Sequence, residues 1–461
     1  MEGRGLGQER VSKWRKPESG VSLQPPHTVW KLQMALNVKA KAAPTFRFYV
    51  LYDKLYRQDV LAHAYQRCKA NKGAPGVDGR TFADIEAYGV EAWLEALAKE
   101  LKDKTYQPNP VKRVWIPKPD GKQRPLGVPT IRDRVVQMAA VLILEPIFEV
   151  DLPPEQHAYR ANKSALDAVQ EVQGLLDAGY TDVVDADLSG YFDSIPHADL
   201  MKSVARRVSD RHLLHLIKMW LAAPVEETDQ RGRKRRTTRN KDEGRGTPQG
   251  GVASPLLANL YMRRFVVGWK QLGHEERLDA RIVNYADDFV ICSRGHADAA
   301  MATMRAMMSR LKLTVNEQKT RRCRLPEDTF TFLSYTFGCH YSRQTGRSYL
   351  GPRPALKKVR KLCRTISELT DRRTCPLDTE IVVRKLNQTL RGWANYFCLG
   401  PVVRTYEVVM KHARRRLRRW LCAKHKVRSG EYARFPNAYL HDQLRLTQLA
   451  VSGHRLLWAT T

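Results

Sequence analysis

The sequence predicts an α+β protein in which a region of mixed helices and strands is followed by an all-helical region. Up to about residue 350, amphipathic helical patterns alternate with short apolar strand patterns. Two of these strands flank a tight turn within residues 282–291, and strands joined by so short a turn pair antiparallel. From Gly351 onward the patterns are helical throughout, which indicates a domain boundary near residue 350. A chain of 461 residues is long enough for about three domains.

The first elements are expected after a basic leader. Residues 1–45 are rich in Lys, Arg, Gly and Pro and show no clean period, which is typical of a poorly ordered segment, so order is expected from about Phe46. An apolar period over residues 50–69 predicts a helix. Three glycines and a proline within residues 71–79 predict a turn after it.

Two further helices are marked by the residues at their ends. Ser164 precedes an apolar stripe that stops before Gly179, so an N-cap and a terminal glycine bound a helix, and a strand follows at Val183. Ser254 is a good N-cap and Pro255 suits the first helical position, which predicts a helix directly after a glycine-rich loop.

The charge balance indicates a polyanionic partner. Lys and Arg number 79 against 48 Asp and Glu, a formal net charge of +31. Such an excess repels itself in a compact chain, whereas a nucleic acid supplies phosphate charges and releases counterions on binding. An anionic membrane surface could also attract it, but no segment approaches the roughly 20 apolar residues that span a bilayer. The longest apolar stretch, residues 135–148, is interrupted by Gln137, Glu145 and Pro146.

The cysteines and the amino terminus indicate where in the cell the protein is located. The eight cysteines are scattered singly, with no C-x-x-C pair and no Cys/His cluster at zinc-ligand spacing, so reduced thiols are expected. Residues 1–24 are polar and basic and hold no apolar stretch of the kind that a secretory signal requires. A cytoplasmic location is therefore predicted.

Asp287 and Asp288 stand between two apolar strands within residues 282–291. An Asp-Asp pair at a turn can be structural, because Asp accepts turn geometry. Here both flanks are apolar, and a buried pair of like charges is costly unless a cation compensates it. Hard oxygen ligands suit Mg²⁺, so a metal site is the favoured interpretation.

Two metal ions require another acid at the end of a neighbouring strand. Asp185 and Asp187 lie on one face of the strand predicted at Val183, and Asp193 follows. The spacing does not choose among the three. In a two-metal site, ions about 4 Å apart activate the attacking hydroxyl and stabilise the leaving group.

The ordered motifs resemble those of group II intron reverse transcriptases, also called intron-encoded maturases, over about residues 60–425. The matching segments are Asn71–Gly79, Ile116–Gly127, Asp187–Asp193, Gly246–Gly251 with Ser254–Asn259, and Tyr285–Asp288. The resemblance implies a right-hand polymerase: fingers and palm with an antiparallel palm sheet over residues 46–350, with a basic insertion at 231–245. Thumb helices are implied over 351–380 and a helical maturase domain (domain X) over 381–461.

The same resemblance assigns the chemistry. It implies RNA-directed DNA polymerase activity with two Mg²⁺ ions on Asp187, Asp287 and Asp288, leaving Asp185 and Asp193 structural. The implied nucleotide-binding residues are Lys118 and Arg124 for the triphosphate, Gln249 beside the nucleotide, Phe192 as a gate against the ribose 2′-hydroxyl, and Lys319, which could protonate pyrophosphate. By composition alone, Lys118 and Arg124 would belong to a solvated basic hairpin, and Lys319 would be an ordinary surface lysine.

RNA contacts are expected on basic surfaces. The run from Lys411 to Trp420 holds seven basic residues, more than a solvated helix face needs. Trp393, Tyr396 and Phe397 are more typical of a helical core. The predicted RNA-binding residues are Arg233, Lys234, Arg235, Arg236, Lys357, Lys358, Lys361, Arg391, Arg414, Arg415 and Arg418. For the insertion at 231–245, a flexible loop is the alternative interpretation.

The predicted function is that of a bifunctional protein, which assists splicing of its group II intron RNA and copies the intron into cDNA during retrohoming. The expected partners are intron RNA, an RNA template with a DNA primer, deoxynucleoside triphosphates and target DNA. No paired cysteines follow Trp420, so the Cys/His endonuclease module of many relatives is expected to be absent. The alternatives are a splicing cofactor with a dispensable polymerase and a domesticated reverse transcriptase in defence or DNA repair. A viral RNA-dependent RNA polymerase is disfavoured, because it would need room for a ribonucleotide at Phe192.

Overall fold

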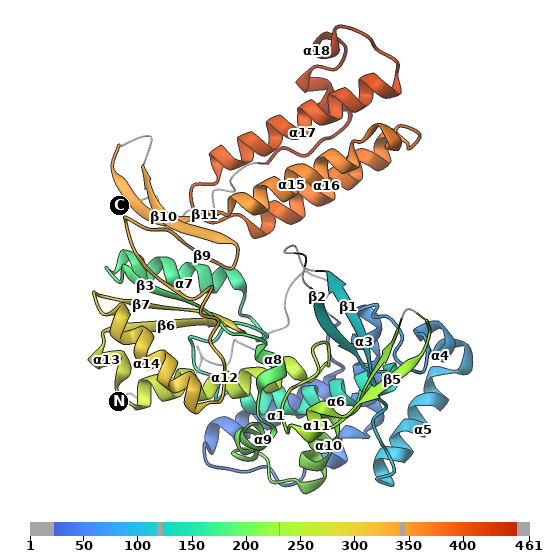
Figure 1. Cartoon of the computed structure of the whole chain (residues 1–461). Helices are drawn as coiled ribbons and strands as arrows, with labels where there is room; N and C mark the ends of the chain where they lie inside the picture. The colour runs from blue at the N-terminus through green and yellow to red at the C-terminus, as the bar shows by residue number, and fades with distance from the viewer. Residues whose placement is uncertain (1–22, 118–120, 122, 230, 342–345, 450–461) are drawn as a thin grey trace, which may run out of the picture.

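The fold is that of a computed structural model, which describes residues 23–117, 121, 123–229, 231–341 and 346–449. Three sheets and several groups of helices form it (Figure 1). The first sheet has the strand order β2-β1-β4-β5, in which β1 pairs antiparallel with β2 and parallel with β4. Its strands are β1 (Val111–Pro117), β2 (Gln123–Val128), β4 (Val225–Thr228) and β5 (Lys234–Thr237).

Helices pack beside this first sheet and form most of the largest core. The long helix α6 contacts both α1 and α3. The helices of this part are α1 (His27–Ala42), α2 (Tyr52–Leu55), α3 (Gln58–Ala70), α4 (Phe82–Tyr88), α5 (Val90–Lys102), α6 (Ile131–Phe148), α9 (His197–Ala205), α10 (Arg211–Leu221) and α11 (Arg239–Asp242).

The second sheet is the palm sheet, with the strand order β6-β7-β3-β8 and antiparallel pairing throughout. Side chains alternate between its faces: Val183 packs in the core with helix α7, and Val184 packs in the core with α12 and α14. The sheet is therefore buried on both sides. Its elements are β3 (Asp182–Asp187), β6 (Ala280–Tyr285), β7 (Asp288–Ser293), β8 (Arg321–Arg324), α7 (Ala165–Asp177), α8 (Tyr191–Ser194), α12 (Ser254–Gln271), α13 (His274–Arg277) and α14 (Ala297–Arg310).

The third sheet connects the palm to the carboxy-terminal helices. Its antiparallel strands run in the order β11-β10-β9 and share a core with α7. The helices beyond it have a hydrophobic core of their own and stand apart from the first sheet (Figure 1). The elements are β9 (Phe330–Phe332), β10 (Tyr335–Tyr341), β11 (Ser348–Pro354), α15 (Leu356–Leu369), η2 (Arg372–Thr374), α16 (Thr379–Tyr396), α17 (Val403–Lys424), α18 (Glu431–Arg434) and η3 (Tyr439–Gln443).

The structure differs from the sequence-based expectation at the amino terminus. The prediction of a poorly ordered leader is wrong for His27–Ala42, which form helix α1. Polar contacts to a distant helix hold α1 in place: Gln33 donates a hydrogen bond to the Leu142 carbonyl at 3.0 Å, and Asn37 donates one to the Pro146 carbonyl at 2.9 Å. Residues 1–22 lie outside the described ranges.

Of three predicted helices, one is present as expected and two differ from the prediction. The helix expected over residues 50–69 is divided into α2 and α3. Ser164 caps α7 through a capping box with Asp167, as predicted. Ser254 begins α12, but its hydroxyl donates to the Pro248 carbonyl at 2.8 Å, so it anchors the preceding loop and does not cap the helix. No helix in the described part of the chain has the length and apolar character needed to cross a bilayer.

Candidate active site

Three carboxylates meet at one end of the palm sheet. Asp187 is the last residue of β3 and Asp288 is the first of β7, and the two stand directly opposite each other in the antiparallel register. Asp287 lies in the turn between β6 and β7, where Ala286 has a φ of 59°. Buried Asn284 holds this turn by donating a hydrogen bond to the Ala286 carbonyl at 2.9 Å. The pairing of β3 with β7 thus brings together acids that are about 100 residues apart in sequence.

Asp187 is bound by two groups from the loop before β8. Lys319 Nζ lies 3.0 Å from Asp187 Oδ2, and Asn316 Nδ2 donates to the same oxygen at 2.9 Å. The backbone of Asn316 also donates to the Asp187 carbonyl at 2.8 Å. The structure therefore brings predicted Lys319 to the acid cluster. Asn316 was not singled out from the sequence, because nothing in a loop asparagine's local pattern indicates its distant partner.

Burial and nearby carboxylates raise the pKa of Asp287 and of Asp288. The pKa of Asp288 is raised to about 7, because protein atoms partly desolvate the carboxyl and because Asp287, Asp187 and Asp185 are close. The Asp288 side chain still reaches solvent, so the repulsion is the contribution that a bound cation would remove. The pKa of Asp287 is also raised, first by burial, while Arg124 and Lys319 counteract the shift.

The other two acids near the site have different surroundings. Asp185 lies 3.5 Å from Arg321 Nε, and burial raises its pKa to about 6. Burial also raises the pKa of Asp193, and the cations that oppose this shift, Arg113 first, belong to the side of the first sheet. Each of these acids therefore has its own basic neighbours.

The first sheet brings Arg124 to the same place. Arg124 Nε donates a hydrogen bond to Gln249 Oε1 at 3.1 Å, so β2 and the glycine-rich loop at 246–251 are joined beside the acids. The Gly127 amide donates to the Gln249 carbonyl at 2.5 Å. Gly250, with a φ of 107°, packs so closely on the Gly127 carbonyl that a Cβ would overlap it. Lys118 lies outside the described residues.

Phe192 and Tyr159 complete the surroundings. Phe192 is 7% exposed, and its carbonyl accepts a hydrogen bond from the Thr247 amide at 2.7 Å, which fixes α8 against the glycine-rich loop. Tyr159 is half-exposed, with a φ of 55°. Its pKa is raised by burial and then by Asp287, which places it beside the acids. Sequence reasoning missed Tyr159, since no motif marked it.

The predicted basic insertion contains strand β5 and the short helix α11. β5 pairs antiparallel with β4, so residues 234–237 extend the first sheet and do not form a flexible loop. Lys234 and Arg236 lie 3.3 and 2.8 Å from the two carboxylate oxygens of Glu226, and Arg233 pairs with Asp229 at 3.0 Å. Arg235 alternates to the other side of the strand and is exposed.

Most of the predicted RNA-binding residues of the helices are exposed. Lys357, Lys358 and Lys361 lie along the solvent side of α15, and Arg391 and Arg415 are exposed on α16 and α17 while Arg414 is half-buried. The prediction for Arg418 is wrong. Its side chain is 2% exposed, donates to the Phe435 carbonyl and to Asn437 Oδ1 at 2.8 Å each, and stacks on Tyr432. Arg418 therefore holds the segment 432–437 against α17. Trp393 and Phe397 pack in the core as expected, with ring centroids 4.7 Å apart.

The carboxylates suit a hard divalent cation whose coordination is completed by water and substrate. Within the described ranges, no three His, Cys, Asp or Glu side chains are grouped so that they could hold a metal ion by themselves. Mg²⁺ commonly uses one or two carboxylates together with water and substrate phosphates, so a full protein cage is not required. The uncompensated repulsion around Asp288, and the Lys319 ammonium beside Asp187, are consistent with a place for positive charge.

Comparisons with known proteins show which proteins the chain is similar to. Residues 116–337 match the model for "Reverse transcriptase (RNA-dependent DNA polymerase)", and residues 359–437 match "Group II intron, maturase-specific domain". The chain is 33% identical to Protein YkfC of Escherichia coli over 349 residues, 66% of this chain and 87% of that protein. It is 35% identical to the group II intron-encoded protein LtrA of Lactococcus lactis over 214 residues, 46% of this chain but only 34% of LtrA. Among solved structures, telomerase from Candida albicans aligns with a TM-score of 0.41 at 12% identity, covering 78% of this chain and 70% of that one.

Proposed function

The chain belongs to the family of group II intron-encoded reverse transcriptases and maturases, and from this premise we propose that Asp187, Asp287 and Asp288 hold two Mg²⁺ ions for DNA synthesis on an RNA template. The observation that carries the proposal is the register of β3 and β7, which sets Asp187 opposite Asp288 beside the turn that holds Asp287. When bound, the metal ions would activate the primer 3′-hydroxyl and stabilise the leaving pyrophosphate.

The chain's own residues position the nucleotide. Arg124, joined to Gln249, is placed to bind the triphosphate of an incoming deoxynucleotide. Lys319 is within reach of Asp187 and can supply a proton or a positive charge to pyrophosphate. Phe192 is held by Thr247, so its ring can exclude a ribose 2′-hydroxyl by shape.

The test compares two acids on one face of one strand. Asp187→Asn removes a proposed metal ligand, and we expect primer extension on an RNA template to fall about a thousandfold, equivalent to roughly 4 kcal/mol of lost transition-state stabilisation. Asp185→Asn makes the same chemical change two residues away, and we expect activity within a few-fold of wild type. Equal losses in the two variants, or full activity in Asp187→Asn, would contradict the assignment.

We further propose that residues 351–380 form the thumb and residues 381–461 the maturase region, which binds group II intron RNA and assists its splicing. The helices α15, α16 and α17 share a core of their own, and their outer faces carry Lys357, Lys358, Lys361, Arg391, Arg414 and Arg415. Splicing assistance needs RNA binding but no nucleotidyl transfer, so Asp187→Asn should retain it. This work on intron RNA would take place in a bacterial cytoplasm.

Retrohoming, with target DNA as a further partner, is the role proposed for a chain that is still encoded inside its intron. Sequencing the DNA around the coding region tests it. A folded group II intron with its catalytic hairpin downstream supports a mobile intron protein, whereas its absence would favour a domesticated enzyme in defence or repair.

A further inference from the structure

A cationic cavity lies beside α12, on a face that carries none of the three acids. It has a volume of about 340 Å³ and is formed by the end of α6 with Asp151, the end of α9 and the second half of α12. On α12, Arg263 and Val267 line the cavity, while Phe265 and Trp269 lie on the opposite face, where Phe265 contacts Phe289 of the palm sheet with ring centroids 5.3 Å apart. The cavity therefore lies on the face of α12 that is turned away from the palm sheet.

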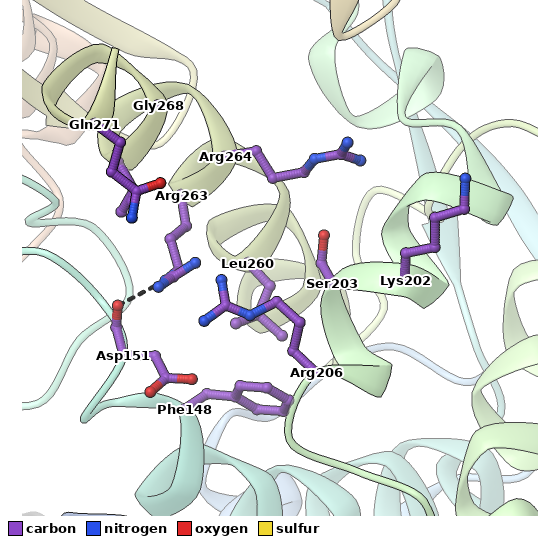
Figure 2. Close-up of a pocket in the computed structure, with 11 residues that line it drawn as sticks. Phe148, Asp151, Lys202, Ser203, Arg206, Leu260, Arg263, Arg264, Gly268 and Gln271 are labelled. Atoms are coloured by element: carbon purple, nitrogen blue, oxygen red, sulfur yellow. Dashed lines mark hydrogen bonds between the residues drawn. The ribbon is translucent and has the colours of Figure 1, made fainter. Parts of the chain in front are cut away.

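Two guanidinium groups converge on this space. Figure 2 shows Arg206 and Arg263 reaching into the cavity from α9 and α12, above Phe148. Arg263 is anchored by a hydrogen bond from its Nε to the Asp151 backbone carbonyl at 2.7 Å. No hydrogen bond or ion pair to Arg206 is found among the described residues, and its side chain is exposed.

The charges around the cavity do not balance. The carboxylate of Asp151 forms an ion pair with buried Arg207, whose Nε lies 3.6 Å from Oδ2. Asp199 is shared by Lys202 at 3.2 Å, by Arg264 at 3.7 Å and by Lys312 at 3.2 Å. Of the charged residues that line the cavity itself, four are cations (Lys202, Arg206, Arg263 and Arg264) and one is an acid, Asp151. Burial, and then repulsion by Arg206, lowers the pKa of Arg263.

Helix ends explain only part of this arrangement. Lys202 and Arg206 stand at the carboxy-terminal end of α9, where cations favour the helix dipole. Arg263 and Arg264 are in the middle of α12, where no such term applies. Convergence of like charges from separate helices costs free energy unless an anion compensates it, and paired guanidinium forks match the geometry of a phosphate.

We propose that this cavity binds a backbone phosphate of the folded RNA partner, with Arg206 and Arg263 as its ligands. The site is a second RNA contact outside the template-primer path, and it rests on the proposed RNA-binding function. The net charge of +31 favours RNA over other occupants, because phosphates spaced along a chain neutralise several basic surfaces at once.

The experiment measures binding of the RNA transcribed from the DNA around the protein's coding region, by filter binding over a range of salt concentrations. For Arg206→Gln/Arg263→Gln we expect affinity to fall about tenfold and the slope of log affinity against log salt to decrease by about 1, the effect of one lost phosphate contact. The control, Lys99→Gln/Lys102→Gln, removes two exposed cations from α5 and should change neither quantity appreciably. Arg206→Glu alone serves if the double variant does not fold, since Arg206 supports no described contact.

Primer extension on a short RNA oligonucleotide separates this site from the polymerase site. We expect the cavity variants to extend it at the wild-type rate. Unchanged RNA affinity and salt slope in the cavity variants would overturn the inference, as would an equal effect in the α5 control or loss of short-template extension. If the wild-type protein itself did not bind the RNA, the proposed maturase function would fail first, and the cavity proposal with it.

Discussion

At the scale of single residues, the acids at the end of the palm sheet carry more negative charge than the neighbouring cations neutralise. Asp288 has three carboxylates nearby, and its pKa is raised to about 7. Lys319 is the one cation in contact with Asp187 in the described structure, and it leaves Asp288 without an ion-pair partner of its own. A cation bound there would relieve this repulsion and, in doing so, displace a proton at lower pH.

This proton competition predicts a pH-dependent metal requirement. Because the pKa of Asp288 is raised, the carboxyl is neutral below about pH 7 and charged above it, so Mg²⁺ must displace a proton on the acid side. We expect the Mg²⁺ concentration for half-maximal primer extension to rise up to about tenfold per pH unit below 7 and to level off above it. Magnesium titrations at several pH values measure this. A requirement that is flat across pH 7 would contradict a role for Asp288 as a ligand.

At the scale of elements, two contacts decide whether neighbouring segments reach their working positions. The first is the approach of the glycine-rich loop to β2, in which Gly250 packs against Gly127 and Leu126. The second is the contact of Arg418 on α17 with the segment 432–437. Both involve residues whose role depends on a partner in another element.

The loop contact predicts that Gly250→Ala is damaging. An added Cβ would overlap the Gly127 carbonyl and lie 3.1 Å from Leu126 Cδ1, at a φ of 107° that disfavours alanine. We expect a loss of about 1–3 kcal/mol in the free energy of unfolding and a marked loss of primer extension, because Gln249 would shift. Gly174→Ala in α7 is the control: its Cβ meets nothing within 4 Å, and it should stabilise the protein by about 0.5–1 kcal/mol. Denaturant unfolding distinguishes the two.

The contact of Arg418 with the segment 432–437 predicts that Arg418→Ala lowers the stability of the protein. Truncation leaves the Phe435 carbonyl and Asn437 without their donor and empties the face of Tyr432, so we expect a loss of about 3 kcal/mol. The adjacent exposed residue gives a matched control, Arg419→Ala, which should change stability by less than about 0.5 kcal/mol. Thermal unfolding measures both. If Arg418→Ala reduced RNA affinity while stability was retained, the original assignment to RNA binding would be restored.

At the scale of the whole molecule, the excess of +31 is distributed over separate surfaces. Some of it is neutralised locally, as where Lys234 and Arg236 enclose Glu226, whose side chain is 5% exposed. Lys234 and Arg236 are themselves exposed, but each is paired, whereas the described residues show no ion pair for the exposed Lys357, Lys358 and Lys361 on α15 or for Arg235 on β5. Counting basic residues therefore overestimates how many are available to RNA.

The β4–β5 hairpin makes this distinction testable. Arg235→Gln removes an exposed cation, and we expect weaker RNA binding and a salt slope smaller by about 1. Lys234→Gln/Arg236→Gln removes the partners of Glu226 instead, so its main effect should be lower thermal stability. RNA binding over a salt series, together with melting curves, checks both variants. Unchanged binding in Arg235→Gln would exclude a contact between the hairpin and RNA.

The sequence by itself determined the features that depend on neighbours along the chain. The capping box of Ser164 and Asp167 and the tight turn with Asp287 and Asp288 are local patterns, and the structure contains both. The helical region expected from Gly351 begins only at Leu356, because strand β11 continues to Pro354. The order of the motifs along the chain was also enough to predict the family. Local propensity and turn chemistry require no knowledge of distant segments.

Only the tertiary structure decided what depends on contacts between distant segments. The register of β3 against β7 sets Asp187 opposite Asp288, and this pairing of distant residues is not contained in their spacing along the chain. Contacts with α6 ordered α1, which the sequence indicated as a loose leader, and the parallel pairing of β1 with β4 made a strand pair of segments more than 100 residues apart. Arg418 is buried although its local pattern is that of an RNA-binding run. Register and burial arise from packing between elements, so no window of local sequence contains them.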